Sequence, residues 1–295
     1  MSGSATPHVF SVDVEEWFQV NALEPWVDRA RWAEYESRVE ASTDRVLELL
    51  ARHGAHGTFF TLGWVAERHP GLLRRIAGAG HEVASHGWWH RRVTTLTPAA
   101  FLEDLRASKA VLEDASGQRV LGFRAPSFSI RPGMEWAFDA LLEAGYEYDS
   151  SLFPIRRPDY GWPGCDPAPH RIDRPMGQLL ELPLATTVIA GLRLPAAGGG
   201  YLRQLPAGLV TRAFREHGGR GEAGVFYVHP WELDPGQPRL ELPWLTRVRH
   251  YRGLSRTEGL LDRLLSTFRF TSVVRRYGMD QSGARPPSWA APALA

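Results

Sequence analysis

The sequence predicts an α/β fold built on a parallel sheet or barrel. Short β-branched runs alternate with amphipathic stretches along most of the chain, and this alternation is typical of parallel α/β folds. Unusual polar residues stand at the ends of several predicted strands, and in a parallel barrel these ends open on one face. The chain has 295 residues, of which 43% are hydrophobic and 23% charged, so it fits one large domain or two small ones.

The composition excludes several classes of protein. The formal net charge is +1, from 34 basic and 33 acidic residues, which gives no indication of a nucleic acid or an anionic membrane as partner. Cys165 is the only cysteine, so an internal disulfide and a thiolate metal cluster are both ruled out. Neither a secretory signal nor an apolar run of about 20 residues that would span a membrane is visible. We therefore expect a cytoplasmic protein.

The first predicted strand leads into three acidic residues. The β-branched run at residues 9–12 predicts a buried strand, and Asp13, Glu15 and Glu16 follow within four positions. Because side chains alternate along a strand, Asp13 and Glu15 share one face. Glu16 points the opposite way and is expected in a surface salt bridge. Two carboxylates at the end of a buried strand require a cationic partner.

The other predicted elements follow in order, each from a local signal. Ser37-x-x-Glu40 is typical of a capping box, and Thr97-Pro98 is typical of a helix start. Six prolines between residues 154 and 175 predict a long ordered loop, and Gly198-Gly-Gly200 predicts a flexible turn beside the cleft. Helices are predicted at residues 37–54, 70–80, 97–112, 132–144, 205–217 and 255–268, with a further short helix between residue 62 and Pro70. Strands are predicted at residues 57–62, 81–85, 120–124, 146–149, 179–182, 224–228 and 268–274.

Polar residues mark the ends of five predicted strands. Each of the following lies at or just past a C-terminal strand end: Asp13, His86, Arg124, Asp149 and His229. Scattered surface charges have no reason to favour the same end of five strands, so we expect these side chains to share one face. Arg124 and Asp149 are expected to form a pair there, and two separate strand-end charges are the alternative.

His86 and His90 predict a metal site. They are four residues apart, and on a helical turn this spacing places both imidazoles on one side. With Asp13 and Glu15 expected nearby, two imidazoles and one carboxylate leave coordination positions open for water and substrate. Open positions are typical of a catalytic metal. Two ordinary surface histidines are the alternative. The combination favours a hydrolase.

Five segments resemble, in order, the motifs of the polysaccharide deacetylases with NodB homology, carbohydrate esterase family 4. Ser11-Val-Asp-Val-Glu15 resembles the family's Thr-Phe-Asp-Asp-Gly, and His86-Gly-Trp-Trp-His90 resembles its His-Ser/Thr-x-x-His. Arg124-Ala-Pro-Ser127, Asp149-Ser-Ser-Leu-Phe-Pro154 and Tyr227-Val-His229 resemble Arg-x-Pro-Tyr, Asp-x-Ser-x-x-Trp and Leu-x-His. The resemblance spans residues 10–230 and implies a distorted (β/α) barrel of seven main strands with a C-terminal elaboration.

The resemblance also implies catalytic roles. Asp13 is the expected general base, which takes a proton from a metal-bound water. Arg124 is expected to hold that carboxylate ionised and oriented, and Asp149 is expected to fix Arg124 in turn. His229 is the expected general acid, which protonates the amine as the acetyl carbon–nitrogen bond breaks.

The remaining site residues follow from the same resemblance. A divalent metal, zinc first and otherwise cobalt, nickel or manganese, would be held by Glu15, His86 and His90. The metal would polarise the acetyl carbonyl, and the backbone N–H of Ser127 would complete an oxyanion hole. Trp231 is assigned to the substrate side of that site.

The sequence departs from the family pattern at three positions. Val14 stands where the family has its second aspartate, a metal ligand, so the ligand role passes to Glu15. Ser127 and Pro154 stand where the family has tyrosine and tryptophan, which changes the wall of the cleft. A metal-poor site is therefore an alternative, as in relatives that open cyclic imides or ureides.

These observations predict one deacetylase domain over residues 1–280, with a subgroup-specific region within residues 155–280 and a disordered tail at 281–295. His229-Pro-Trp-Glu232 and Arg249-His-Tyr-Arg-Gly253 resemble a bacterial subgroup found with exopolysaccharide and PEP-C-terminal sorting loci. The predicted reaction is metal-dependent removal of N-acetyl groups from N-acetylhexosamine units of a bacterial exopolysaccharide or its precursor. The alternatives are a cyclic imide or ureide hydrolase and a non-catalytic carbohydrate-binding relative.

Overall fold

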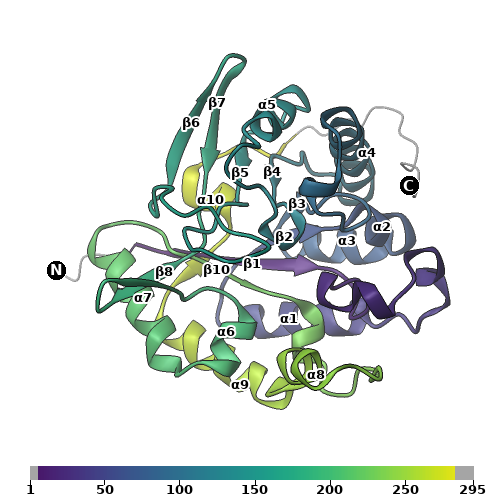
Figure 1. Cartoon of the computed structure of the whole chain (residues 1–295), viewed down its shortest axis with the longest axis vertical. Coiled ribbons are helices and arrows are strands. Elements are labelled where there is room, and N and C mark those ends of the chain that lie inside the picture. The colour runs from purple at the N-terminus through teal and green to yellow at the C-terminus, as the bar shows by residue number, and fades with distance from the viewer. Residues whose placement is uncertain (1–5, 283–295) are drawn as a thin grey trace.

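A nine-stranded sheet forms the centre of residues 6–282, the part of the chain that this computed structural model describes (Figure 1). Its strands follow the order β10-β1-β2-β3-β4-β5-β7-β6, and β11 also pairs with β1. All neighbouring pairs are parallel except β6 and β7. The strands are β1 (His8–Val14), β2 (Thr58–Thr61), β3 (Glu82–Ser85), β4 (Gly122–Phe123), β5 (Tyr148–Asp149), β6 (His170–Arg174), β7 (Gly177–Glu181), β10 (Val225–Val228) and β11 (Phe270–Thr271).

The two ends of the parallel run meet. Leu184, shortly after β7, forms a parallel bridge with Val225 at the start of β10, and the Ala185 N–H donates to the Val225 carbonyl at 3.1 Å. The run from β10 through β1 to β7 contains seven parallel strands. The predicted α/β class with parallel strands is therefore confirmed. The ring is irregular because β4 and β5 contribute only two residues each.

Ten α-helices within residues 6–282 surround the sheet (Figure 1). The longest, α4, begins as predicted, because the Thr97 hydroxyl accepts a hydrogen bond from the Ala100 N–H at 3.2 Å. The helices are α1 (Val39–Arg52), α2 (Gly63–Arg68), α3 (Pro70–Gly78), α4 (Pro98–Ser116), α5 (Trp136–Glu143), α6 (Gly199–Gln204), α7 (Ala207–Gly219), α8 (Trp244–Tyr251), α9 (Leu254–Thr267) and α10 (Val273–Tyr277). None of these helices is long and apolar enough to cross a lipid bilayer.

The start of α1 corrects two predictions. The predicted capping box at Ser37 and Glu40 does not form; instead the Glu16 carboxylate accepts hydrogen bonds from the Arg38 N–H at 3.0 Å and from the Ser37 hydroxyl. Glu16 is therefore buried rather than in the surface salt bridge that alternation predicted. The reason is that β1 ends at Val14, so the two-residue alternation no longer applies at Glu16. Burial raises the pKa of Glu16, and its hydrogen bonds oppose that rise.

Several C-terminal elements differ from the prediction. The strand predicted at residues 268–274 is only the two-residue β11, and α10 follows it at once. The antiparallel hairpin of β8 (Thr186–Ile189) and β9 (Leu192–Pro195), and helix α8, were not predicted. The predicted disordered tail begins at Gln281, which exchanges two hydrogen bonds of 3.0 Å with the Arg119 backbone. Residues 283–295 of that tail lie outside the described residues.

Candidate metal and catalytic site

The structure brings the predicted strand-end residues to one face of the sheet. Asp13 lies near the end of β1, and Asp149 is the last residue of β5. His86, Arg124 and His229 each follow the last residue of β3, β4 or β10 directly. Because all five strands are parallel, their carboxyl ends lie at the same edge, as the sequence predicted.

Glu15, His86 and His90 form a buried donor cluster. One donor atom from each residue lies within 4.8 Å of the others, and the His90 Nε2 atom is 2.8 Å from Glu15 Oε2. The His86 Nδ1 atom donates to the Arg124 carbonyl at 2.8 Å, which leaves Nε2 as the free ligand atom. One carboxylate and two imidazoles are the donor set of catalytic zinc sites, so these residues fit a divalent metal.

The two histidines meet through a strained loop, not the predicted helical turn. Gly87 has φ +75° and His90 has φ +52°, and the two imidazole centroids are 5.2 Å apart. Asp104 of α4 anchors this loop, because its carboxylate accepts from the Trp88 N–H at 3.0 Å. A Cβ at position 87 would lie 2.9 Å from Asp104 Oδ1, so the loop requires glycine there. Burial raises the pKa of Asp104 to about 7.

Asp13 is paired with Arg124, which is fully buried. The Arg124 Nη1 atom donates to Asp13 Oδ1 at 2.6 Å and to the Ser11 hydroxyl at 2.8 Å. The other guanidinium nitrogens donate to the carbonyl and hydroxyl of Ser150, at 3.1 and 2.9 Å. The second carboxylate oxygen of Asp13 is left facing His229, whose Nε2 atom is 4.0 Å away.

Asp149 does not hold Arg124, which corrects the predicted pairing. It lies opposite Glu181 in the parallel register of β5 and β7, and in-register neighbours on adjacent strands point to the same face. Asp149 therefore lies beside the Glu181 carboxyl, and it accepts a hydrogen bond from the Ser151 hydroxyl at 2.6 Å. Burial raises the pKa of both carboxyls, that of Asp149 to about 6, so the pair retains a proton.

His229 is partly exposed, at 20% of its side-chain surface, and it sits among carboxylates. Its Nδ1 atom is 2.9 Å from Glu232 Oε1, and its Nε2 atom is 3.6 Å from Glu15 Oε1. Burial alone would lower the pKa of His229, but the charges of Glu15 and Glu232 raise it to about 9.

Glu232 and Arg203 were missed by the sequence analysis. Glu232 accepts from Arg203 Nε at 2.9 Å, and this arginine holds its pKa at about 2 despite burial. The only local signal is the three-residue spacing from His229, which closes one turn of the 3-10 helix Pro230–Leu233. Gly199, in the predicted flexible turn, instead begins α6 and must be glycine, because a Cβ there would lie 2.7 Å from the Glu232 carboxylate.

Trp231 holds the donor cluster through a hydrogen bond to Glu15, whereas the sequence predicted a contact with substrate. Its indole N–H donates to Glu15 Oε1 at 3.1 Å, which leaves Oε2 directed at the histidines. The indole is stacked between the imidazoles of His229 and His250, with centroid distances of 5.1 and 4.4 Å. Ser127 has φ +54° and ψ +26°, a left-handed conformation that is strained for serine and recurs at functional sites.

Fold and site together define a parallel α/β protein with a carboxylate–histidine cluster at its strand ends. Residues 32–148 match the family "Polysaccharide deacetylase", and residues 150–277 match "Domain of unknown function (DUF3473)". Residues 32–148 thus correspond to a polysaccharide deacetylase domain of the NodB type, carbohydrate esterase family 4.

Curated relatives support this assignment over part of the chain. A chitooligosaccharide deacetylase of Rhizobium leguminosarum bv. trifolii is 34% identical over 128 residues, which are 35% of this chain and 60% of the relative. The peptidoglycan-N-acetylglucosamine deacetylase PgdA of Listeria monocytogenes is 33% identical over 107 residues, 33% of this chain and 23% of the relative. The chain therefore spans at most three fifths of the length of these two relatives.

Solved structures share the fold over nearly the whole chain. A Mycobacterium smegmatis protein assigned to the polysaccharide deacetylases superposes with a TM-score of 0.62 at 20% identity, covering 98% of this chain and 97% of its own. Puue allantoinase gives a TM-score of 0.59 at 17% identity, covering 95% and 91%. At these identities the likeness establishes the fold alone.

Proposed function

We propose that the protein is a metal-dependent hydrolase that removes N-acetyl groups from N-acetylhexosamine units of a saccharide. The observation that carries this proposal is the buried cluster of Glu15, His86 and His90 beside Asp13 and His229. It places metal donors, a candidate base and a candidate acid within contact of one another. The relatives named as chitooligosaccharide and peptidoglycan deacetylases support the same bond type.

The base side of the reaction is built from Asp13 and Arg124. A divalent cation on the donor cluster would supply a Lewis acid that polarises the acetyl carbonyl and acidifies a water. Asp13 accepts the proton of the attacking water on Oδ2, because Oδ1 is occupied by the 2.6 Å contact with Arg124. The four hydrogen bonds of Arg124 keep the carboxylate in one orientation during this transfer.

The acid side is built from His229 and Glu232. The Nδ1–H of His229 donates to Glu232, so the mobile proton sits on Nε2, which faces Asp13 and Glu15. Nε2 donates this proton to the nitrogen of the leaving amine as the bond to the acetyl carbon breaks. The backbone N–H of Ser127 donates to the developing oxyanion. No covalent intermediate is needed.

As substrate we propose a bacterial exopolysaccharide or its precursor, and this proposal rests on the sequence resemblance alone. Residues 150–277 match a domain of unknown function, so the match adds no information on the substrate. Zinc as the metal and a cytoplasmic location likewise remain predictions. The first experiment is acetate release by the metal-loaded protein from N-acetylated chitooligosaccharides, which should be abolished by a chelator and restored by zinc.

Replacing Glu15 by glutamine (Glu15→Gln) is expected to remove the metal. A neutral amide is a poor ligand, and Glu15 is the only carboxylate in the donor cluster. Elemental analysis should find close to one divalent ion per wild-type chain. In a binding titration, the affinity for zinc should be at least a hundredfold lower for the variant than for the wild type. Glu16→Gln is the matched control, because this neighbouring buried carboxylate caps α1 and should leave metal content unchanged.

The same measurements separate the alternative functions. A wild-type protein that holds no metal and hydrolyses a cyclic ureide would be a cyclic imide or ureide hydrolase and not a deacetylase. A protein that binds N-acetylated glycans tightly without turnover, and equally well after Glu15→Gln, would be a carbohydrate-binding relative.

Replacing Glu232 by glutamine (Glu232→Gln) is expected to lower kcat by roughly tenfold to a hundredfold, as for other residues that orient a reacting side chain. Glu232 raises the pKa of His229, so its loss lowers that pKa. His229 must be protonated to act as an acid, and the alkaline limb of the kcat profile therefore moves to lower pH. An alkaline limb at the wild-type position would show that His229 is not the acid. Glu143→Gln, an exposed change on α5, is the control.

A further inference from the structure

Helix α8 presents large apolar side chains to solvent. Trp244 is 65% exposed and Leu245 is 64% exposed, although they are adjacent at the start of the helix. The last turn of α8 holds the helix in place, because His250 stacks on Trp231 and Tyr251 is buried. Single exposed apolar residues are ordinary, whereas neighbouring ones on a fixed helix mark an interaction surface.

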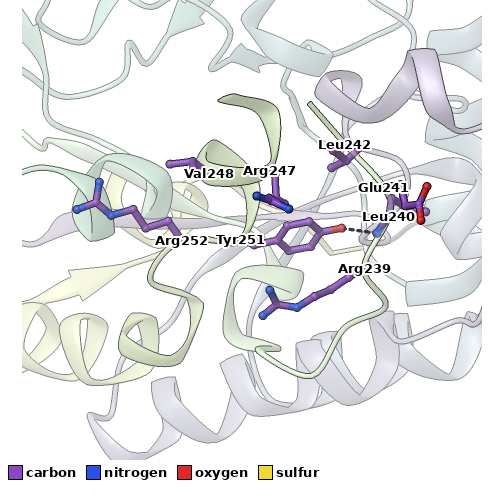
Figure 2. A pocket seen from close by; sticks show the side chains of 8 residues that line it. All are labelled: Arg239, Leu240, Glu241, Leu242, Arg247, Val248, Tyr251 and Arg252. Atoms are coloured by element: carbon purple, nitrogen blue, oxygen red, sulfur yellow. Dashed lines mark hydrogen bonds between the residues drawn. The ribbon is translucent and has the colours of Figure 1, made fainter. Parts of the chain in front are cut away.

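A groove of about 890 Å³ runs between α8 and the loop before it (Figure 2). Figure 2 shows Tyr251 between Arg247 and Arg239, with its hydroxyl accepting a hydrogen bond from the Leu240 N–H at 3.0 Å. The floor is therefore apolar and aromatic, and its rim is basic. The groove is lined by Arg239, Leu240, Glu241, Leu242, Arg247, Val248, Tyr251 and Arg252.

Positive charge is concentrated around this groove. Residues 238–252 contain four arginines and one acidic residue, a formal charge of +3, whereas the whole chain carries +1. The rest of the chain is therefore at −2, which is why overall composition gave no sign of an anionic partner.

The arginines at the groove lack acidic partners. Among the described residues, the groove-lining Arg239, Arg247 and Arg252 form no ion pair, although Arg239 lies over the Tyr251 ring at 5.2 Å. Arg249, elsewhere on α8, also forms none. Some exposed arginines elsewhere are paired with acids, as Arg75 is with both Glu40 and Asp44. Uncompensated guanidinium groups around an apolar floor select a partner that is anionic and apolar at once.

We propose that α8 and the loop before it, residues 238–252, dock on the surface of a bilayer that contains anionic lipids. Trp244 and Leu245 enter the headgroup region, where an indole ring is favoured, and the arginines contact the lipid phosphates. A nucleic acid or an acidic glycan would use the arginines but leave Trp244 and Leu245 in water. The inference is independent of the proposed deacetylation.

The docking surface is joined to the candidate active site by packed side chains. His250 stacks on Trp231 at 4.4 Å, and Trp231 donates to the ligand carboxylate of Glu15. Gln237 ties the same parts together, because its amide donates to the Trp231 carbonyl at 2.7 Å and its carbonyl oxygen lies 3.0 Å from His250 Nε2. A protein docked through α8 thereby carries its candidate site close to the lipid surface.

The test is sedimentation of the full chain with large unilamellar vesicles of phosphatidylcholine alone or with 30% phosphatidylglycerol. The wild type is expected to bind the anionic vesicles and to be released by 0.5 M salt. Trp244→Ser with Leu245→Ser should weaken binding at least tenfold. Arg247→Glu with Arg249→Glu should abolish the preference for anionic vesicles.

Matched controls change the same residue types elsewhere. Leu192→Ser removes a side chain that is 68% exposed on β9, and Arg74→Glu with Arg171→Glu reverses two exposed arginines on α3 and β6. Both controls should bind as the wild type does, and every variant should release acetate from a soluble oligosaccharide at the wild-type rate.

Wild-type binding that is absent, equal on both vesicle types, or insensitive to the α8 changes overturns the proposal. A dimer that the α8 changes disperse, without vesicle binding, would assign the surface to a second copy instead.

Discussion

Replacing Asp13 by asparagine (Asp13→Asn) is expected to lower kcat/KM for an N-acetylated oligosaccharide by about a thousandfold, within the range that a general base contributes. The amide keeps the size of the side chain and can still accept the Arg124 hydrogen bond, but it cannot take a proton from water. Asp13 is not one of the three donors of the metal cluster. Metal content should therefore stay at the wild-type level while turnover is lost.

Metal content and turnover, measured together, distinguish the role of Asp13 from that of Glu15. Asp13→Asn should bind metal without turnover, whereas Glu15→Gln should lose both metal binding and turnover. Asp173→Asn on the exposed hairpin strand β6 is the matched control and should be as active as the wild type. An Asp13→Asn protein that keeps more than a third of wild-type kcat/KM would remove Asp13 as the base and leave Glu15 or a solvent path in its place.

The sequence predicted which residues gather at one edge of the sheet because strand ends are a local signal. Asp13, His86, Arg124 and His229 each follow a short hydrophobic run, and a parallel sheet brings such ends together without further information. The errors occurred where alternation was extended past a strand. Glu16 lies two residues beyond the end of β1, and it turns inward to cap α1.

The partners of the site residues could not be predicted, because they depend on contacts between distant segments. Glu181 meets Asp149 only through the register of β5 and β7. Arg203 reaches Glu232 from α6, a helix that was not predicted and whose first two residues lie in the predicted flexible turn. The surface of α8 was missed for a different reason: its basic residues are balanced by acids elsewhere, so overall charge conceals it.

Replacing Arg124 by methionine (Arg124→Met) is expected to lower the free energy of unfolding of the metal-free protein by about 3–5 kcal/mol, the usual cost of breaking a buried ion pair from one side. Methionine fills most of the volume and can lie on the Phe60 ring, which Arg124 now covers at 4.1 Å. It leaves the Asp13 carboxylate buried without its hydrogen-bonded guanidinium, and it removes the donors to Ser11 and Ser150. Urea unfolding in the presence of a chelator measures this cost without a contribution from bound metal.

Arg106→Met supplies the matched control. Arg106 pairs with Glu143 at 2.8 Å, a distance similar to that of the buried pair, but both side chains are largely exposed. Its loss should cost less than about 1 kcal/mol. Adding Asp13→Asn to Arg124→Met should recover part of the lost stability, because the double variant no longer buries the charge of the Asp13 carboxylate. If Arg124→Met costs no more than Arg106→Met, or if the double variant is less stable than the sum of the single changes, Asp13 and Arg124 do not form the buried ion pair on which the base assignment depends.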